Sequence, residues 1–264
     1  MGAAILMPGP VSQLGSRFIR FVGGLGGMAR FTVSVARASV TPPLRLSEYL
    51  RELYKLGVLS LVIVCVSGIA VGMVLGLQGF HTLSRFGAEH SVGELVGLSL
   101  IRELGPVLTA LLLAGSAGSA TAAEIASMVV TQQLDGLRML SIDPVSFAIK
   151  PKAAAMLTVT PMLTAMFIIC GIYGGYLVDV GILKGDPGSY MAGLHSAISF
   201  QVDIACCLLK SMIFGAMLGL VATYRGYTSE PTAEGVSAAT TSAVVIASVG
   251  VLLCDYIITA LWGI

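Results

Sequence analysis

The sequence has few charged residues, since Asp, Glu, Lys and Arg together make up only 11% of its 264 residues. A soluble domain carries about 25% charged residues, so this scarcity argues against a soluble fold. Hydrophobic residues account for 56%, and the mean hydropathy is +0.91. The formal net charge of +1 gives no electrostatic reason to expect nucleic-acid binding. The composition therefore indicates an integral membrane protein.

The motifs of common catalytic and nucleotide sites are also missing. The chain contains neither a GxxxxGK[ST] loop, which cradles nucleotide phosphates, nor an HExxH zinc motif. The histidines His81, His90 and His195 are scattered, and they form no Ser/His/Asp arrangement that can be argued. We therefore expect a non-catalytic protein with no metal site and no cofactor of its own, whose energy comes from a partner or a gradient.

Cysteine is sparse as well: the five cysteines all fall in hydrophobic stretches and form no CxxC pair. We interpret them as small apolar packing residues rather than as metal or disulfide ligands. The N-terminus lacks the short apolar core and cleavage site of a signal peptide. The first hydrophobic stretch is therefore expected to remain in the protein.

Long apolar runs are what the sequence does contain. A membrane-spanning helix needs about 20 such residues, and five runs reach that length. They lie near residues 57–79, 92–114, 153–178, 204–224 and 236–263. None alternates apolar and polar residues as a β-barrel strand would. The sequence predicts an all-α membrane domain of five spans within residues 44–264.

Lysine and arginine are distributed unequally around these runs. Seven precede the first run, three lie between the second and third, and one lies between the fourth and fifth, whereas only Arg85 and Lys184 lie on the opposite side. Cytoplasmic loops of membrane proteins carry the excess of positive charge. The distribution predicts that the N-terminus and residues 124–152 are cytoplasmic and that the C-terminus is outside.

Residues 1–43 are predicted to form an N-terminal interfacial helix rather than a span. On a helical wheel, Leu14 and Phe18 lie on one side and Arg20 and Arg30 on the other. Such a helix lies in the membrane surface with its arginines near anionic headgroups. The glycines of GGLGG weaken a helix, and a flexible basic tail remains the alternative.

In the first run, Gly68, Gly72 and Gly76 recur at four-residue spacing. Small residues at this spacing let a second helix approach closely. Because glycine is frequent in membrane helices anyway, the pattern leaves two possibilities open. These residues either form a seam between two copies or pack helices within one copy.

The second run contains the charged pair Arg102 and Glu103. At 1.5 Å per residue, Arg102 lies about 15 Å from a start at Val92, near the membrane midplane. A charge there costs roughly 2.5–3.5 kcal/mol on insertion scales, and such residues face a bundle interior or a cavity. Because adjacent helical residues point about 100° apart, each is expected to need its own partner. The pair either contacts substrate or belongs to a structural ion-pair network.

Three other residues bear on this polar pair. Pro106 is tolerated in a span where neighbouring groups take up the freed carbonyl. Lys210 lies about 10 Å past Asp203 at helical rise. It can reach the outer interface or turn inward to Glu103, and we favour the inward orientation. Asp255 lies near the outer end of the fifth run, where a solvated or capping role is the default.

A polar segment separates the second and third runs. Small residues occupy 114–123, and residues 124–140 mix apolar and polar side chains. A short cytoplasmic helix over 124–140 would suit docking, although an ordinary surface loop would have a similar pattern. Asp143 followed by Pro144 is a typical helix start, with the Asp as cap and the Pro in the first turn.

Several motifs, in order, resemble the MlaE/YrbE family of ABC-transporter permeases. They are GMVLGLQG (72–79), LSLIRELGPVLTALLLAG (98–115), the GSAxxAEI region (118–125), QLDGLRMLSIDP (133–144), CLLKS (207–211), Phe214-Gly215, ATTSAVV (239–245) and DYIITAL (255–261). The similarity extends over about residues 45–264.

This resemblance implies a homodimeric permease of the bacterial inner membrane, with its C-terminus in the periplasm and phospholipid in a cavity between the copies. Its implied partners are an ATPase subunit (MlaF-like) that carries ATP and Mg²⁺, a STAS-domain subunit (MlaB-like) bound through the ATPase, and a hexameric MCE-domain protein (MlaD-like). The implied function is to move phospholipids between the inner membrane and the periplasmic MCE protein, which maintains outer-membrane lipid asymmetry.

The resemblance also assigns residues to these roles. The implied substrate-binding residues are Arg102, Glu103, Lys210, Leu75, Leu77, Phe86 and Leu98. The implied ATPase-coupling residues, on a coupling helix at about 124–140, are Glu124, Met128, Gln132, Gln133, Asp135 and Arg138. Ser116 and Gln132 stand where family members usually carry Arg and Glu, so an ion pair with the ATPase at these positions is not carried over.

A phospholipid offers an anionic phosphate and two apolar chains. A chamber with Arg102 and Lys210 near its outer side would fit that shape, and Glu103 would balance the cations when it is empty. The alternatives are a permease of the same family for a sterol or fatty acid, an ion-coupled secondary transporter, and a scaffold for the MCE ring. Secondary transporters usually show broken helices in both halves, and the Gly-Pro break here has no matching half.

Overall fold

The computed structural model describes residues 23–24, 26–38 and 46–262. The chain divides into two compact units, Met1–Leu44 and Arg45–Ile264. In the first unit, residues 26–38 are helical. Most of the predicted interfacial helix, Leu14 and Phe18 included, lies outside the described residues.

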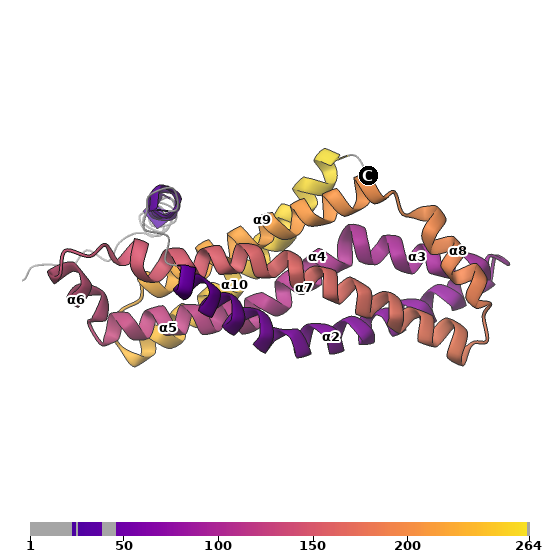
Figure 1. Ribbon diagram of the computed structural model, residues 1–264, viewed down its shortest axis with the longest axis horizontal. Coiled ribbons are helices and arrows are strands. Elements are labelled where there is room, and N and C mark those ends of the chain that lie inside the picture. Colours follow the sequence, from indigo (N-terminus) through magenta and orange to yellow (C-terminus); the bar gives the residue numbers. More distant parts are fainter. Residues whose placement is uncertain (1–22, 25, 39–45, 263–264) are drawn as a thin grey trace, which may run out of the picture. The chain divides into compact units, whose positions relative to one another are not determined.

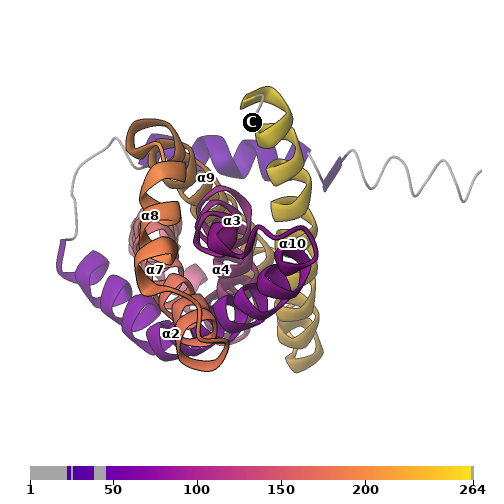
Figure 2. The same ribbon diagram turned by 90° about the vertical axis from the view of Figure 1, so that its right-hand side faces the viewer.

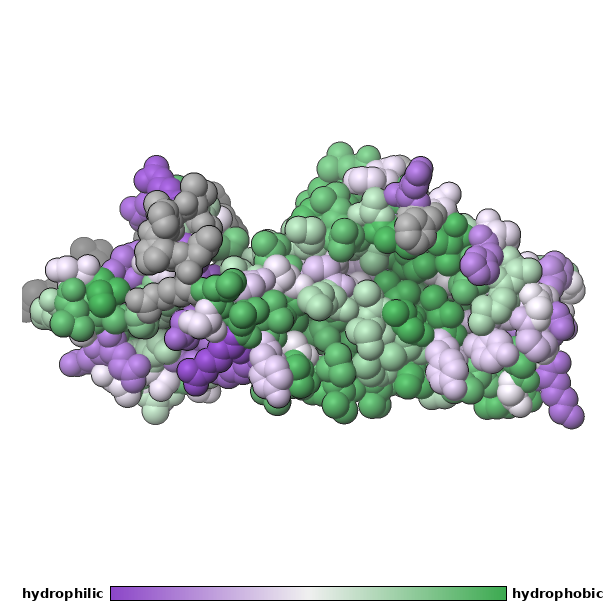
Figure 3. Space-filling view, viewed as in Figure 1, coloured by the Kyte–Doolittle hydropathy of each residue, from purple (hydrophilic) through white to green (hydrophobic). Residues whose placement is uncertain are grey.

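Five helical segments of the second unit are long and apolar enough to cross a membrane. They are Leu46–Ser84, Glu89–Val130, Val145–Ile182, Gln201–Tyr227 and Ala233–Trp262. The residues that the structure describes contain no strand, so the predicted all-α architecture with five spans is confirmed. Hydrophobic residues cover much of the middle of the face shown in Figure 3, as expected of a surface that meets lipid.

The spans are assembled from α-helices and short π-helical turns. The α-helices are α2 (Leu46–Ser84), α3 (Val92–Ser99), α4 (Gly105–Leu113), α5 (Ser119–Val130), α6 (Gln133–Met139), α7 (Lys150–Tyr176), α8 (Pro187–Ala197), α9 (Phe200–Tyr227) and α10 (Ala233–Trp262). In the second unit α6 and α8 lie at opposite ends (Figure 1). In the end-on view α3 and α4 lie centrally, with α2, α7, α9 and α10 around them (Figure 2). The span that carries Arg102 and Glu103 is therefore the core of the bundle.

The helices extend further than hydrophobicity predicted. Helix α2 begins at Leu46, ahead of the apolar run at 57–79, and the second helical segment continues past residue 114 to Val130. The small residues after Leu113 form a π-helical turn, Ala114–Gly118, rather than a break. Because water and headgroups can solvate polar side chains at the ends of a membrane helix, the helix need not stop where the apolar run stops.

The structure divides the predicted coupling segment, residues 124–140, between two helices. Helix α5 runs on to Val130, and the short helix α6 starts only at Gln133. Between them Gln132 adopts a left-handed conformation with φ of 57°. Left-handed backbone cannot continue a right-handed helix, so the chain turns a corner there.

The glycine stripe of α2 packs against α7 of the same chain. Gly68, Gly72 and Gly76 are all buried. A Cβ atom added at Gly76 would lie 3.0 Å from the carbonyl oxygen of Gly175, and one added at Gly72 would overlap the backbone of Gly171. The stripe therefore serves helix packing within one copy, and it cannot also be a seam between two copies.

A local signal starts the third span, and a contact with α8 forms in its second half. Asp143 accepts hydrogen bonds from the backbone N–H groups of Val145 at 3.2 Å and Ser146 at 3.1 Å, which confirms the predicted helix start. At the opposite end, the Tyr190 hydroxyl on α8 donates to the Ile172 carbonyl at 3.1 Å. Tyr190 is buried, so it anchors α8 to the bundle.

Candidate functional site

The polar centre of the bundle forms at a π-helical turn, Leu100–Leu104. Such turns occur often at functional sites because they bulge one residue out of the helix. Pro106 has no N–H group, so the carbonyl of Arg102, four residues earlier, loses its usual α-helical partner. The Lys210 ammonium donates to that carbonyl at 2.9 Å. The prediction that a neighbouring group takes up the freed carbonyl is confirmed.

Arg102 and Glu103 form separate ion pairs with α9. The Arg102 Nε atom lies 2.9 Å from Asp203 Oδ1, and Glu103 Oε2 lies 3.0 Å from Lys210 Nζ. Each therefore has its own partner, as their adjacent positions on a helix predicted. The inward orientation of Lys210 is also confirmed.

Lys210 joins three helical segments at this centre. Its ammonium lies 3.1 Å from Asp255 Oδ1 and donates to Thr259 Oγ1 at 2.8 Å, and both residues are on α10. The Thr259 hydroxyl in turn donates to Glu103 at 3.1 Å. The default solvated or capping role for Asp255 is wrong, because its carboxylate pairs with a buried lysine.

The cluster contains more carboxylates than cations. Arg102 and Lys210 face Glu103, Asp203 and Asp255, which leaves one negative charge in excess when all five are ionised. It is not the cationic surface that Arg102 and Lys210 alone suggested. Mutual ion pairs offset the large desolvation penalty of burying these groups in a membrane protein.

Only part of this cluster is accessible. The side chains of Arg102 and Glu103 are 35% and 41% exposed, whereas that of Lys210 is 1% exposed. In the described part of the chain the terminal nitrogens of Arg102 have no hydrogen-bond partner, because the bond to Asp203 uses Nε. Lys210 therefore does not line an open surface; it holds Arg102 and Glu103, which do reach the surface.

The four predicted apolar lining residues come from separate parts of the described chain. Leu75 and Leu77 lie on α2, Leu98 lies on α3, and Phe86 is highly exposed just after α2. An apolar pocket of about 220 Å³ instead lies beside Ile101, the neighbour of Arg102. Helices α7 and α9 complete it through Pro161, Ala165, Ile168, Ile169, Ile204, Cys207, Leu208 and Ser211.

Four of the six predicted coupling residues lie at the exposed corner between α5 and α6. They are Gln132, Gln133, Asp135 and Arg138. Leu134 is buried and anchors α6, whereas Met139 at its end is 87% exposed and Leu140 is nearly as exposed. The corner therefore presents an apolar tip surrounded by polar side chains.

Arg138 fastens this corner to α9. Its guanidinium lies 2.7 Å from Asp135 Oδ1 and donates to the Tyr227 hydroxyl at 2.6 Å. Glu124 differs from the other predicted coupling residues, because it points toward α2 and α7 and pairs with Lys55 at 2.6 Å. Met128, one turn further along α5, lines a hollow on the same side.

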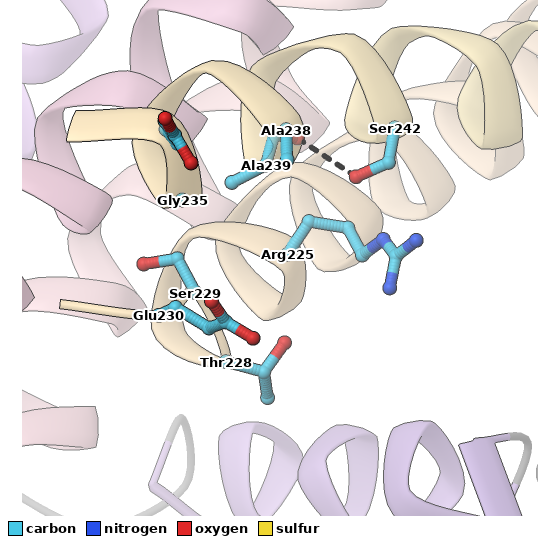
Figure 4. Close-up of a pocket in the computed structure, with 9 residues that line it drawn as sticks. Arg225, Thr228, Ser229, Glu230, Gly235, Ala238, Ala239 and Ser242 are labelled. Atoms are coloured by element: carbon cyan, nitrogen blue, oxygen red, sulfur yellow. Dashed lines mark hydrogen bonds between the residues drawn. The ribbon is translucent and has the colours of Figure 1, made fainter. Parts of the chain in front are cut away.

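A separate open pocket of about 450 Å³ lies where α9 turns into α10. Residues of both helices line it: Arg225, Thr228, Ser229, Glu230, Glu234, Gly235, Ala238, Ala239 and Ser242. The Arg225 side chain points away from Glu230, and the Ser242 hydroxyl donates a hydrogen bond to the Ala239 carbonyl at 3.1 Å (Figure 4). None of the residues predicted from the sequence lies there. Glu230 and Glu234 outnumber Arg225 in its lining, and the net negative charge disfavours an anion.

Sequence reasoning missed the acidic partners of the site. Asp203 lies just outside the predicted fourth run and Asp255 was given a solvated or capping role, yet both pair with cations of the cluster. Asp203 stands one residue before the run at 204–224, and Asp255 stands about two helical turns before the end of the run at 236–263. Lys210 is a cation in a run, 204–224, that contains no carboxylate, and this was the signal to search the neighbouring runs for its partner.

Known proteins of similar sequence include several membrane permeases. A family described as Permease MlaE matches residues 49–261. The chain is 42% identical over 253 residues to the intermembrane phospholipid transport system permease protein MlaE of Haemophilus influenzae, covering 95% of this chain and 96% of the relative. It is 39% identical over 251 residues to a probable ABC transporter permease protein of Rickettsia felis, with the same coverage.

A more distant relative comes from a plant. The chain is 33% identical over 211 residues to the chloroplastic protein TRIGALACTOSYLDIACYLGLYCEROL 1 of Arabidopsis thaliana, covering 80% of this chain and 60% of the relative. The match to the family covers the whole charged cluster and all five membrane-spanning segments except the first three residues of the first and the last residue of the fifth. This chain is a member of the MlaE family of ABC-transporter permeases.

Proposed function

We propose that this chain is the membrane-spanning subunit of an ATP-driven transporter that moves phospholipids between the inner membrane and a periplasmic MCE-type protein, and so maintains outer-membrane lipid asymmetry. The observation that carries the proposal is that Arg102 and Glu103 are partly exposed while Ile101, next to them in sequence, lines an apolar pocket, in a chain similar to a named phospholipid permease. A phospholipid combines a charged headgroup with apolar chains, and this site offers contacts for both.

Arg102 is the group that would contact the lipid phosphate. Its Nε is held by Asp203, so the planar guanidinium is oriented while its terminal nitrogens remain available. Arginine suits this role because its fork of donors matches the oxygens of a phosphate. Glu103 lies next to it with a large exposed fraction and would accept from an ammonium or hydroxyl of the headgroup. Lys210 positions both residues, through the Arg102 carbonyl and the Glu103 carboxylate.

The proposed assembly places the motor at the α5–α6 end. A second copy of this chain completes the permease, and an MlaF-like ATPase that carries ATP and Mg²⁺ binds the apolar tip at Met139 and Leu140. An MlaB-like STAS protein would bind through that ATPase. A hexameric MlaD-like MCE protein would stand at the periplasmic end, near α8. The chain itself hydrolyses nothing, and its N-terminus is cytoplasmic and its C-terminus periplasmic.

The lipid contact can be tested with a variant in which the ion pair between Arg102 and Asp203 is replaced by two neutral side chains. Replacing Arg102→Gln together with Asp203→Asn removes the guanidinium without leaving a buried carboxylate unpaired. Because a hydrogen bond to a charged group contributes about 1.5–3 kcal/mol, we expect ATP-driven phospholipid transfer from proteoliposomes to fall by about tenfold or more. Arg85→Gln, at an exposed arginine beyond α2, is the matched control and should transfer lipid normally.

Each outcome of this experiment is informative. Normal transfer by the double variant would remove Arg102 from lipid recognition. Transfer that proceeds without ATP would favour an ion-coupled transporter. Mass spectrometry of lipid that co-purifies with the assembly identifies the cargo. A sterol, a fatty acid or a galactolipid, the class in the name of the plant relative, would replace phospholipid in the proposal.

The ATPase contact predicts a second result. An apolar side chain that fills a partner's groove loses its burial energy when it becomes charged. Met139→Asp with Leu140→Asp is therefore expected to abolish co-purification of the ATPase while the permease still folds. Met191→Asp, at an exposed methionine of α8, is the control and should leave ATPase binding intact. Retention of the ATPase by the first variant would contradict the docking site.

A further inference from the structure

Four charged residues form a bridge between helices at the α5–α6 end of the second unit. Glu124 Oε2 lies 2.6 Å from Lys55 Nζ of α2, and Glu124 Oε1 lies 2.9 Å from Lys152 Nζ of α7. Lys152 also pairs with Glu52 of α2 at 2.7 Å. Both oxygens of Glu124 are therefore used to hold α5 to two other helices.

This bridge crosses a hollow rather than a packed interface. A pocket of about 290 Å³ lies between the three helices, lined by Glu48, Arg51, Glu52, Lys55, Glu124, Met128, Phe147, Ala148, Pro151 and Lys152. In the described chain α5 packs against α9 and α10, and α2 packs against α7, whereas α5 makes at most marginal backbone contact with α2 or α7. The long side chains of the bridge thus span a space that backbone packing leaves open.

The α9 side of α5 is close-packed by contrast. A Cβ atom added at Gly226 of α9 would lie 2.7 Å from the Ala122 carbonyl and 2.8 Å from the Cβ of Ile125. Interiors packed this tightly move as units, because they have no intermediate arrangements. Helix α9 is also close-packed on α7, at Gly215 and Gly219, but these contacts lie further from the α5–α6 end than Gly226. The end of α9 that holds α5 is therefore expected to bend with α5 away from α2 and α7.

The charges are arranged so that no buried cation is left unpaired when α5 separates from α2 and α7. Lys152 is 3% exposed, and a buried cation without a partner is strongly unfavourable. When Glu124 withdraws, Lys152 still has Glu52. Lys55 and Glu124 are both partly exposed, so water can solvate them, and exposed ion pairs contribute little to stability. Opening this bridge breaks two contacts that are weak or replaceable.

We propose that Glu124 is the movable member of an ionic latch, which closes the hollow between α5 and the α2–α7 pair in one state of the transport cycle and opens it in another. Helix α5 ends six residues after Glu124 and leads through the Gln132 corner to α6. Of the four residues of the bridge, Glu124 is therefore the one that a push on α6 reaches first along the chain. The proposal rests on the proposed function, in which the ATPase binds at that corner.

A reversible cross-link tests whether the latch must open. Lys55→Cys and Glu124→Cys, joined by a short reducible bis-thiol linker in the complete transporter, would lock α5 to α2. We expect the lock to abolish ATP-driven lipid transfer and a reductant to restore the rate that the same variant shows before linking. The matched control is Tyr49→Cys with Thr158→Cys. These residues hydrogen bond at 2.9 Å between α2 and α7, which are not expected to separate.

Bridging the control pair should leave transfer unchanged, and each single-cysteine variant treated with the linker reports any effect of the native cysteines. Transfer that continues with the latch bridged, or equal inhibition by the control pair, would overturn the proposal.

A second measurement separates this proposal from the function on which it rests. The yield of the 55–124 cross-link is compared in the nucleotide-free and ATP-bound transporter. We expect the yield to change severalfold with nucleotide, while the 49–158 yield stays constant. If wild-type protein transfers no lipid, the proposed function fails, yet the cross-linking yields still decide whether the latch moves. Equal yields in both nucleotide states would refute the latch.

Discussion

Replacing Lys210→Met is expected to destabilise the folded bundle by about 3–5 kcal/mol, the cost of breaking a buried ion pair from one side. Lys210 is 1% exposed and pairs with both Glu103 and Asp255. Without the ammonium, Asp255 faces Glu103 with no cation between them, and the freed carbonyl of Arg102 loses its donor. A large fall in thermal stability in detergent should follow, measured by the loss of the monodisperse peak after heating.

A variant in which the carboxylate partners of Lys210 are also neutral tests whether unpaired charge causes this effect. In a chain that combines Lys210→Met with Glu103→Gln and Asp255→Asn, no carboxylate is left unpaired at this point, so most of the lost stability should return. Lys184→Met, at an exposed lysine of the loop before α8, should behave as wild type. If Lys210→Met were as stable as Lys184→Met, the network would not be what holds α9, α10 and the second span together.

The sequence predicted the parts of this site that depend on local chemistry. The partner that Pro106 requires, the inward turn of Lys210 and the helix start at Asp143 each follow from a single residue's hydrogen-bonding needs, and each is present. What the sequence could not place is the partner on a distant helix. Asp203 and Asp255 are ordinary span-end carboxylates until the rotation of α9 and α10 brings them to the same centre.

The coupling segment shows a different limit. Mixed polar and apolar residues over 124–140 are compatible with one helix, and the left-handed residue at Gln132 carries no glycine or asparagine signal. The corner therefore could not be read from the sequence. The same corner turns Glu124 away from Gln133 and Asp135, so one predicted surface becomes two: an exposed α6 tip and an inward ionic bridge.

Gly72→Ala is expected to be among the most damaging single substitutions in the chain. The added methyl would overlap the backbone of Gly171, and neither helix backbone can yield without parting α2 from α7. Overpacking a well-packed interior costs about 1–3 kcal/mol and occasionally more, and backbone contact places this case at the upper end. Thermal stability in detergent should fall accordingly, with Gly76→Ala, whose methyl would meet Gly175 at 3.0 Å, less affected.

The control for this series is Gly115→Ala, also within a membrane helix but with open space where its methyl would lie. Alanine there should be neutral or stabilising by up to about 1 kcal/mol, because glycine is the poorer helix former. The series also separates packing within one copy from a seam between copies. If these glycines lay between two copies, the substitutions would release folded monomers. Because they lie between α2 and α7 of one chain, the substitutions should instead lower the stability of each copy.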